Sequence, residues 1–435
     1  MRQAFFLTVL LALALPAHAA EPPKDEAQRL YQSYGDAVYQ VQTIDLTSDR
    51  KSGIGSGFQF TADGLIATNY HVVAEAVQRP TDNRIEFLHD KGEKGQLTVL
   101  AVDVIHDLAI VRMDKPGKSF LSLGTSHLPK GVKLFSLGNP HDIGFTIIEG
   151  TYNGLSRESF IDKIHFSGSI NPGMSGGPAI SHDGRVTGIN VATAGNQISF
   201  LVPVEPLAIL QTSISKDTKS TNFGKAIQSQ LLDNQKRNVD GLLKKDWDSM
   251  PFGPVRVPGR IDEVLKCWGG INHKDKDPYQ YFYSICSTQD NIFLDNEFDT
   301  GAIFYRYDYT LPKDDMNLAR FYDFYERQFS YPGGDYKNAK EDDVTNYDCN
   351  SRFVDMSGQR WKSNFCIRQY KKYPAVYDMY MALAMVGGER HGLSITFGAQ
   401  GVSRESALAL SEKFLKGIQA PLPAHAVKEK KEGKK

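Results

Sequence analysis

The chain has 435 residues, of which 41% are hydrophobic and 23% charged, and its formal net charge is -1. This length allows two domains with separate cores. Because basic residues do not outnumber acidic ones, the composition excludes a general role in binding polyanions, and we expect no nucleic-acid partner. The basic stretch 428–435 is interpreted as a solvated end, and residues 419–435 are predicted to form a flexible tail.

The first residues have the pattern of a secretory signal peptide. Arg2 precedes an apolar run from Ala4 to Leu15, and residues 17–19, Ala-His-Ala, match the small-x-small rule for cleavage. An uncleaved membrane anchor is the alternative, but the run is shorter than the ~20 residues of a spanning helix. The sequence therefore predicts a signal peptide over residues 1–19 and export to the periplasm or beyond, without stable membrane insertion.

All four cysteines lie in the C-terminal half of the chain. Export makes disulfides plausible, and four cysteines allow three pairings. Of these we expect the pairs of sequence neighbours, Cys267–Cys286 and Cys349–Cys366. None belongs to a Cys-x-x-Cys pair, so we expect no metal site, and we predict no cofactor. The region before Cys267 must then be stabilised by packing alone.

Short extended segments separated by turns fill the chain from Ala37 to about Val204, after a helix predicted over residues 27–34. Evenly spaced short strands without helical periodicity indicate an all-β sandwich or a pair of barrels. The segments with strand character are 38–46, 55–60, 65–68, 84–88, 96–104, 108–113, 132–137, 145–155, 161–165, 179–180, 186–191 and 198–202.

From Pro206 onward the pattern changes to helical, with helices predicted over 207–213 and 223–243. Prolines and glycines between 251 and 259 mark the boundary of a second domain. We therefore predict a first domain over residues 27–212, a helical and Pro-rich connector over 213–258, and a C-terminal domain over 259–418.

The C-terminal domain is rich in Tyr and Phe, and we interpret these aromatics as core residues rather than an exposed binding face. The sequence predicts a small α+β domain with disulfides, whose role stays open. Its predicted strands are 279–283, 303–309, 375–385 and 392–397, the last two paired, and its predicted helices are 317–328 and 404–418, the second capped by Ser403.

One serine stands among glycines in the segment 171–178, Asn-Pro-Gly-Met-Ser-Gly-Gly-Pro. Glycine tolerates positive φ and allows close approach of a substrate, which suits a hydroxyl on a tight turn. A plain turn is the alternative, since short motifs recur by chance. Upstream, His71 ends an apolar strand, and Asp107 leads directly into another. The order His, Asp, Ser is that of the chymotrypsin-type triad.

A serine hydroxyl is a poor nucleophile, so a base must take its proton and a carboxylate must fix the tautomer of that base. We predict His71 as the base, Asp107 as its orienting carboxylate and Ser175 as the nucleophile. The backbone N–H groups of Gly173 and Ser175 are predicted to form the oxyanion hole. Asp103 is the rival carboxylate, although it falls within the preceding predicted strand.

Together, four segments resemble the HtrA/Deg branch of the trypsin-fold serine proteases. They are 68–73 (Thr-Asn-Tyr-His-Val-Val), 107–111 (Asp-Leu-Ala-Ile-Val), 138–140 (Gly-Asn-Pro) and 171–178. The resemblance spans about residues 37–210. It implies a mainly β fold of two six-stranded antiparallel β-barrels with the triad between them. It also implies polypeptide partners, and it leaves a homo-oligomer open, because family members are often trimers but their trimer-forming N-terminal segment has no match here.

Two departures from the family matter. Met174 stands where HtrA-type proteins have Asn and digestive proteases have Asp, so activation by pairing with a newly cut N-terminus is excluded. We expect the loop to be ordered by substrate, by a neighbouring domain or by another subunit. In addition, no Gly-Leu-Gly-Phe-like loop of a PDZ domain follows residue 210.

In trypsin-type proteases the base of the specificity pocket lies six residues before the nucleophile, which is Ser169 here, followed by Ile170. The opposing wall is predicted to come from Asn190, Val191 and Ala192. Because no acidic residue stands at the base, we expect cleavage after small to medium aliphatic residues rather than after basic ones.

The sequence thus predicts an exported serine endopeptidase that cleaves exposed or unfolded polypeptides through an acyl-enzyme. A catalytically silent binding or scaffold protein with a protease fold is the first alternative. A hydrolase that favours esters is the second.

Overall fold

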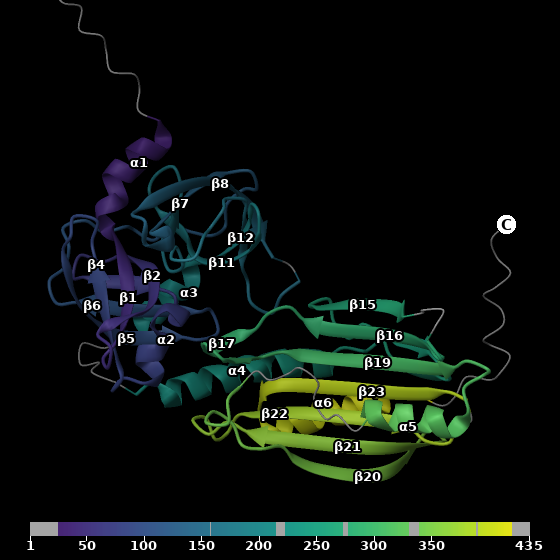
Figure 1. The fold of residues 1–435 in the computed structure, drawn as a ribbon. Coiled ribbons are helices and arrows are strands. Elements are labelled where there is room, and N and C mark those ends of the chain that lie inside the picture. Colours follow the sequence, from purple (N-terminus) through teal and green to yellow (C-terminus); the bar gives the residue numbers. More distant parts are fainter. Residues whose placement is uncertain are drawn as a thin grey trace, which may run out of the picture.

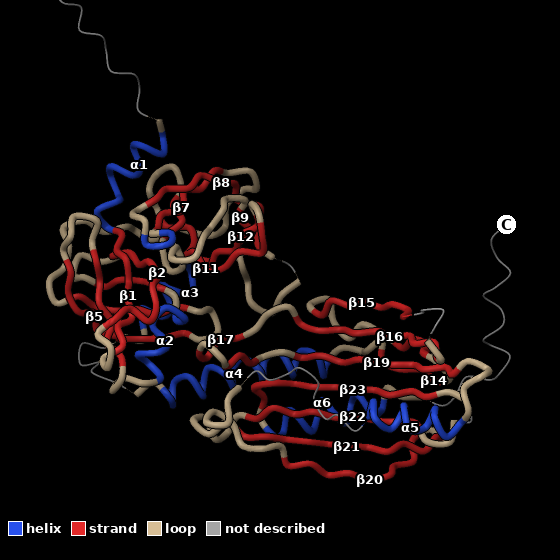
Figure 2. The backbone as a smooth tube through the Cα atoms, viewed as in Figure 1, coloured by secondary structure: helices blue, strands red, loops and turns tan. Residues whose placement is uncertain are grey.

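The computed structural model describes residues 25–156, 158–214, 222–272, 277–329, 339–388 and 390–419. Strands predominate in both halves of the chain, and most helices lie along the surfaces of the strands (Figure 2). The predicted signal peptide and, apart from Gln419, the predicted tail lie outside the described residues. Within the described ranges, no helix combines the length and the apolar character that crossing a membrane requires.

Six antiparallel strands close the first barrel, in the order β1-β2-β3-β6-β5-β4, with β4 pairing back onto β1. Helix α1 (Glu26–Tyr34) and the turn η1 (Gly35–Ala37) precede it, and helix α2 (Tyr70–Gln78) follows β3. The strands are β1 (Val38–Asp45), β2 (Arg50–Gln59), β3 (Leu65–Thr68), β4 (Asn83–Leu88), β5 (Lys94–Asp103) and β6 (Leu108–Met113).

The second barrel closes in the order β10-β11-β12-β9-β8-β7, with β7 pairing back onto β10. A short turn, η2 (Pro140–Asp142), follows β7, and helix α3 (Val204–Thr212) follows the last strand. The strands are β7 (Lys133–Gly138), β8 (Thr146–Leu155), β9 (Ile164–Phe166), β10 (Pro178–Ile180), β11 (Val186–Gly195) and β12 (Ile198–Pro203). The predicted pair of six-stranded barrels is therefore confirmed.

Helix α4 (Gly224–Lys244) joins the two halves of the molecule. Its apolar side chains recur at helical spacing, so they form one stripe along the helix. Near its start, Ile227 and Leu231 pack into the core of the first barrel, whereas Val239 and Leu242 pack into the core of the C-terminal half. The predicted connector thus contains a long helix whose two ends pack into different cores. The short strands β13 (Ser249–Phe252) and β14 (Val255–Pro258) follow it.

The C-terminal half is built on one seven-stranded antiparallel sheet in the order β15-β16-β19-β23-β22-β21-β20 (Figure 1). A separate hairpin, β17 (Ile292–Asp295) and β18 (Phe298–Thr300), lies between β16 and β19 in the chain. The sheet strands are β15 (Leu265–Asn272), β16 (Tyr279–Thr288), β19 (Ile303–Pro312), β20 (Asp348–Met356), β21 (Gln359–Gln369), β22 (Tyr377–Met385) and β23 (Gly392–Val402).

Helices cover both faces of this sheet. Helix α6 (Arg404–Lys416), whose first turn is capped by the Ser403 hydroxyl as predicted, packs with α4 against one face. There Tyr305 and Tyr307 are fully buried, which confirms for these residues that the aromatics form the core. Helix α5 (Leu318–Phe329) covers the other face, where Tyr325 packs near Phe304.

Both disulfides have the predicted pairing, and each joins residues that face each other on neighbouring strands. Cys267–Cys286 links β15 to β16, and Cys349–Cys366 links β20 to β21. Since β15 and β20 are the two outer strands of the sheet, each disulfide fastens an edge strand to the interior of the sheet.

Candidate active site

His71 and Asp107 form a hydrogen-bonded pair on the first barrel. His71 lies in the first turn of α2, and Asp107 directly precedes β6. The imidazole Nδ1 lies 2.6 Å from Asp107 Oδ2, while the backbone N–H of His71 donates to Asp107 Oδ1 at 2.8 Å. One carboxylate therefore fixes both the position and the tautomer of the imidazole, leaving Nε2 as the acceptor nitrogen.

The backbone around Asp107 explains why this pair forms. Asp107 has a φ of 54°, a left-handed conformation that Asp tolerates better than most residues. Its carbonyl accepts from the N–H of Tyr70 at 3.1 Å and from the side-chain amide of Asn69 at 2.8 Å. The carboxylate also lies at the N-terminus of α2, where the helix dipole favours a negative charge. The start of α2 and the start of β6 are thus held together as one unit.

The rival carboxylate, Asp103, is engaged elsewhere. Its Oδ2 lies 2.7 Å from Nδ1 of His106, and its Oδ1 accepts from the backbone N–H groups of Ile105 and His106. The structure therefore contains two Asp–His pairs within a few residues, of which only the Asp107 pair includes the histidine of α2.

The loop that carries Ser175 is anchored in the second barrel by its neighbour. Met174 has no exposed surface and packs into the barrel core among Leu134, Phe166 and Leu201. Asn190, also fully buried, donates from its side chain to the carbonyls of Leu137 and Met174 at 3.1 and 3.2 Å. The residue before Ser175 is thus fixed by apolar burial of its side chain and by a hydrogen bond to its carbonyl.

A single serine of the first barrel connects this loop to β2. The hydroxyl of Ser56 donates to the carbonyl of Gly173 at 2.7 Å and accepts from the N–H of Asn139 at 2.9 Å. Its backbone N–H donates to the carbonyl of Ser175 at 2.7 Å. Ser56 is fully buried, so these bonds form away from water.

The nucleophile loop also lies against the start of α2. A Cβ added to Gly176 would come 2.9 Å from the backbone nitrogen of Asn69, two residues before His71. A Cβ on Gly55 would meet both Val72 and the carbonyl of Ser175, 2.5 Å and 3.1 Å away. Only glycine fits at both positions, so the spacing between Ser175 and the residues around His71 depends on them.

The two predicted oxyanion donors have no competing acceptor among the described residues: neither the Gly173 nor the Ser175 backbone N–H donates to another protein group there. The preceding carbonyl, that of Pro172, accepts from the N–H of His141 at 2.8 Å. Gly173 has a φ of 95°, and a Cβ there would collide with the carbonyl of Asn139. Hydrogen bonds to neighbouring backbone groups and the positive φ of Gly173 therefore define the shape of this loop.

The predicted pocket residues divide into two groups. Ser169 and Ala192 are exposed and Val191 is half-buried. Ile170, in contrast, is buried beside Met174, and the side chain of Asn190 is used by the hydrogen bonds described above. The structure therefore brings Ser169, Val191 and Ala192 to the surface, while Ile170 and Asn190 lie beneath the loop.

The electrostatics of the pair suit proton transfer. Burial lowers the pKa of His71, but the charge and the hydrogen bond of Asp107 raise it, and the net pKa lies above the ordinary 6.5. A base with a pKa near neutrality both accepts and releases a proton readily. Within the described residues, no group of His, Cys, Asp and Glu side chains has the arrangement of a metal site.

Sequence reasoning missed three contributors to this site. Ser56 lies in β2 without a recognisable motif, and Asn139 stands out in the sequence only as part of a Gly-Asn-Pro segment. The third is Phe293 from β17, whose ring lies 6.0 Å from that of His71 at an interplanar angle of 73°. No local signal marks a residue more than two hundred positions from its partner.

Comparison with known proteins finds similarity over the N-terminal half of the chain. Residues 55–189 match the family model of the trypsin-like peptidase domain. The chain is 35% identical over 160 residues to a probable periplasmic DegP-like serine endoprotease of Chlamydia pneumoniae, an alignment that covers 34% of this chain and 32% of that protein. It is 28% identical over 300 residues to the chloroplastic Protease Do-like 1 of Arabidopsis thaliana, covering 59% and 66%.

A solved structure also matches part of the chain. The crystal structure of Deg5 matches with 28% identity and a TM-score of 0.37, covering 42% of this chain and 91% of that one. In each of the two relatives described above, the chain spans less than two thirds of the length. The N-terminal half of the chain is therefore similar to HtrA/DegP-type serine proteases, and its two barrels include the match to the trypsin-like peptidase domain.

Proposed function

We propose that the protein is an exported serine endopeptidase that cleaves exposed or unfolded polypeptides. The observation that carries this proposal is the pair of contacts between His71 and Asp107, at 2.6 and 2.8 Å, beside the loop of Ser175. Export is supported by the periplasmic DegP-like relatives and by the N-terminal sequence pattern.

In this proposal Ser175 Oγ attacks the scissile carbonyl while His71 Nε2 takes its proton. The resulting oxyanion accepts hydrogen bonds from the N–H groups of Gly173 and Ser175. His71 then gives the proton to the leaving amine, and an acyl-enzyme forms on Ser175. Water, activated by the same imidazole, hydrolyses the acyl-enzyme and restores the serine.

The side chains around the proposed pocket favour a small or medium aliphatic residue before the scissile bond. Ser169 carries no charge, so a basic substrate side chain would have no partner at the base of the pocket. Val191 and Ala192 offer short apolar walls. Discrimination between aliphatic side chains of different size is typically modest, about 10- to 200-fold.

Mass-spectrometric cleavage profiling of an unfolded protein tests this proposal. We expect wild type to cut mainly after Ala, Val or Leu, and Ser175→Ala to leave the substrate intact. Faster turnover after Arg or Glu would contradict the pocket assignment. If neither protein cuts, a peptide-versus-ester comparison separates an esterase from a silent scaffold.

A further inference from the structure

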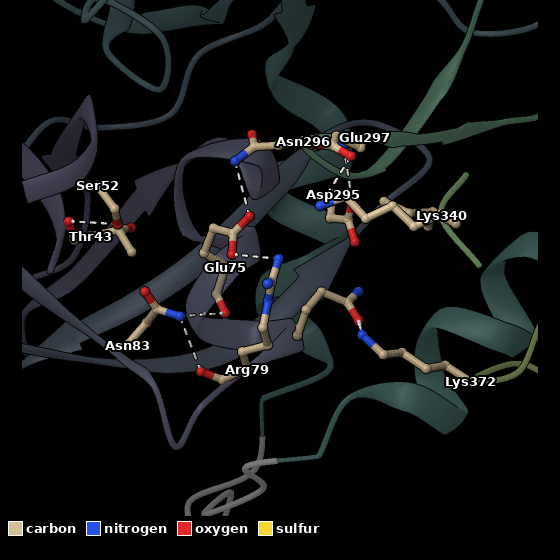
Figure 3. A network of polar contacts seen from close by, with 12 residues as sticks. Thr43, Ser52, Glu75, Arg79, Asn83, Asp295, Asn296, Glu297, Lys340 and Lys372 are labelled. Carbon is tan, nitrogen blue, oxygen red and sulfur yellow. Dashed lines mark hydrogen bonds and ion pairs between the residues drawn. The ribbon is translucent and has the colours of Figure 1, made fainter. Parts of the chain in front are cut away.

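The segment 290–296 of the C-terminal half bridges the two barrels next to His71. At one end, Asp290 pairs with Lys163 at 2.9 Å and accepts from the hydroxyl of Ser159, both in the chain just before β9 of the second barrel. At the other end, Asn296 donates to Glu75 of α2 at 3.0 Å, and Glu75 also pairs with Arg79 (Figure 3).

Between these ends, the segment is fixed by apolar burial and by one buried hydrogen bond. The carbonyl of Leu294 accepts from the hydroxyl of Tyr70 at 3.0 Å. Ile292 and Leu294 belong to the same buried cluster as residues that precede Asp107, Val104 and Ile105. The segment is therefore packed as part of the protease core and has a fixed position relative to His71.

Within this segment, Phe293 is the residue that contacts the imidazole. Its ring meets those of His71 and Tyr70 edge-to-face, at centroid distances of 6.0 and 6.4 Å. The side chain of His71 remains 29% exposed, and Phe293 is only half-buried. The segment therefore flanks the imidazole and does not seal it from solvent.

We propose that Phe293 is a specificity-determining residue of the active site, supplied by the C-terminal half. We assign the side chain of the substrate residue before the cleaved one to the exposed side of the imidazole, where it would meet the Phe293 ring. The ring would give small apolar side chains a contact surface and would restrict the space for large ones. This inference rests on the proposed function.

The test uses the full-length protein and a peptide series that varies only this substrate residue, from Gly and Ala through Val to Leu and Phe. In wild type we expect kcat/KM to fall for the two largest side chains. In Phe293→Ala, kcat/KM for Leu and Phe should rise relative to Ala by about tenfold, because the space next to His71 is opened. Phe293→Tyr should keep the wild-type preference.

The matched control is Asn296→Ala, which removes a contact of the same segment without changing the ring, and should leave the preference unchanged. Titration with a fluorophosphonate probe counts the active sites in each variant. Full labelling with the same preference in wild type and Phe293→Ala would overturn this inference alone. Absence of labelling in folded wild type would overturn the proposed function, and this inference with it.

Discussion

The two halves of the molecule differ in how the edges of their β-sheets are stabilised. In the N-terminal half every barrel strand has two neighbours, and that half contains no cysteine. The C-terminal half is an open sheet, and its outer strands β15 and β20 each carry a cysteine bonded to the next strand. Unpaired strand edges are weak points of open sheets, whereas closed barrels have none. The disulfides therefore lie on the two edge strands that an open sheet leaves with a single neighbour.

The halves also differ in what they contribute to the candidate site. The barrels supply His71, Asp107 and Ser175 together with the loop that carries the serine. The C-terminal half supplies the segment 290–296, which contacts His71 and helix α2. Helix α4 packs into both cores, and the segment 290–296 packs into the core of the first barrel, so the halves are structurally coupled. The comparison predicts that catalysis depends on the barrels, edge stability on the disulfides, and substrate preference on both halves.

The largest expected effect comes from Asp107→Asn. The amide would favour the wrong tautomer of His71, and kcat should fall by about 10⁴-fold. Steady-state kinetics on a fluorogenic peptide measures this. Asp103→Asn is the matched control, because it disrupts an equivalent contact to His106, and it should change kcat little. Equal losses in both variants would contradict the assignment of Asp107.

Met174→Ala should destabilise the second barrel by about 2–5 kcal/mol, because it leaves a cavity in the core under the nucleophile loop. Activity should fall as well, since the proposed oxyanion donors, Gly173 and Ser175, lie on either side of this residue. Met174→Leu keeps the volume and should cost less than about 1.5 kcal/mol. Chemical denaturation followed by circular dichroism gives both values. Wild-type stability in Met174→Ala would show that the loop is anchored by other means.

Removing one disulfide tests how the edge strands of the C-terminal half are stabilised. The double variant Cys267→Ser, Cys286→Ser opens a loop with a sequence separation of 19, which should cost about 3 kcal/mol. All three tryptophans, Trp247, Trp268 and Trp361, lie in the C-terminal half, so their fluorescence reports on its unfolding. We expect a lower fluorescence midpoint and unchanged peptidase activity below it. An unchanged midpoint would mean that the disulfide does not stabilise the edge strand β15.

The smallest effect is a shift in the pH profile. His71 must be neutral to act as a base, so kcat/KM falls as the pH decreases through its pKa. Because Asp107 raises this pKa, the midpoint of the acid limb should lie above 6.5. In Asp107→Asn, residual activity should show a lower midpoint, since the raising contribution is lost while burial remains. If the acid limb of the pH profile is the same in wild type and Asp107→Asn, Asp107 does not set the pKa of His71.

How far the sequence predicts the structure also differs between the halves. In the barrels, turn signals and apolar strands indicated every strand, and the triad candidates stood at strand ends. In the C-terminal half, the sequence analysis predicted none of β15, β17, β18, β20 and β21. In β20 most side chains are exposed on both faces, which removes the period-two pattern. The sequence also did not predict that the Met174 side chain anchors the loop in the core of the second barrel, because no local pattern shows which side chain of a loop is buried.

The contact between Phe293 and His71 arises because a segment of the C-terminal half packs into the core of the first barrel. Neither residue carries a local signal for the other, and the helix that joins the halves falls in the predicted helical and Pro-rich connector. Its double role is visible in its buried apolar residues, which extend from Ile227 near its start to Leu242 near its end and reach both cores. Long apolar stripes in apparent linkers therefore merit attention as domain contacts.

The most direct test of the central claim is labelling of the folded, full-length protein with a fluorophosphonate probe. The account predicts one labelled site in wild type, mapped to Ser175 by mass spectrometry, no labelling in Ser175→Ala, and strongly slowed labelling in Asp107→Asn. Folded wild type that stays unlabelled would contradict it, and would indicate a protease fold that serves only to present a surface.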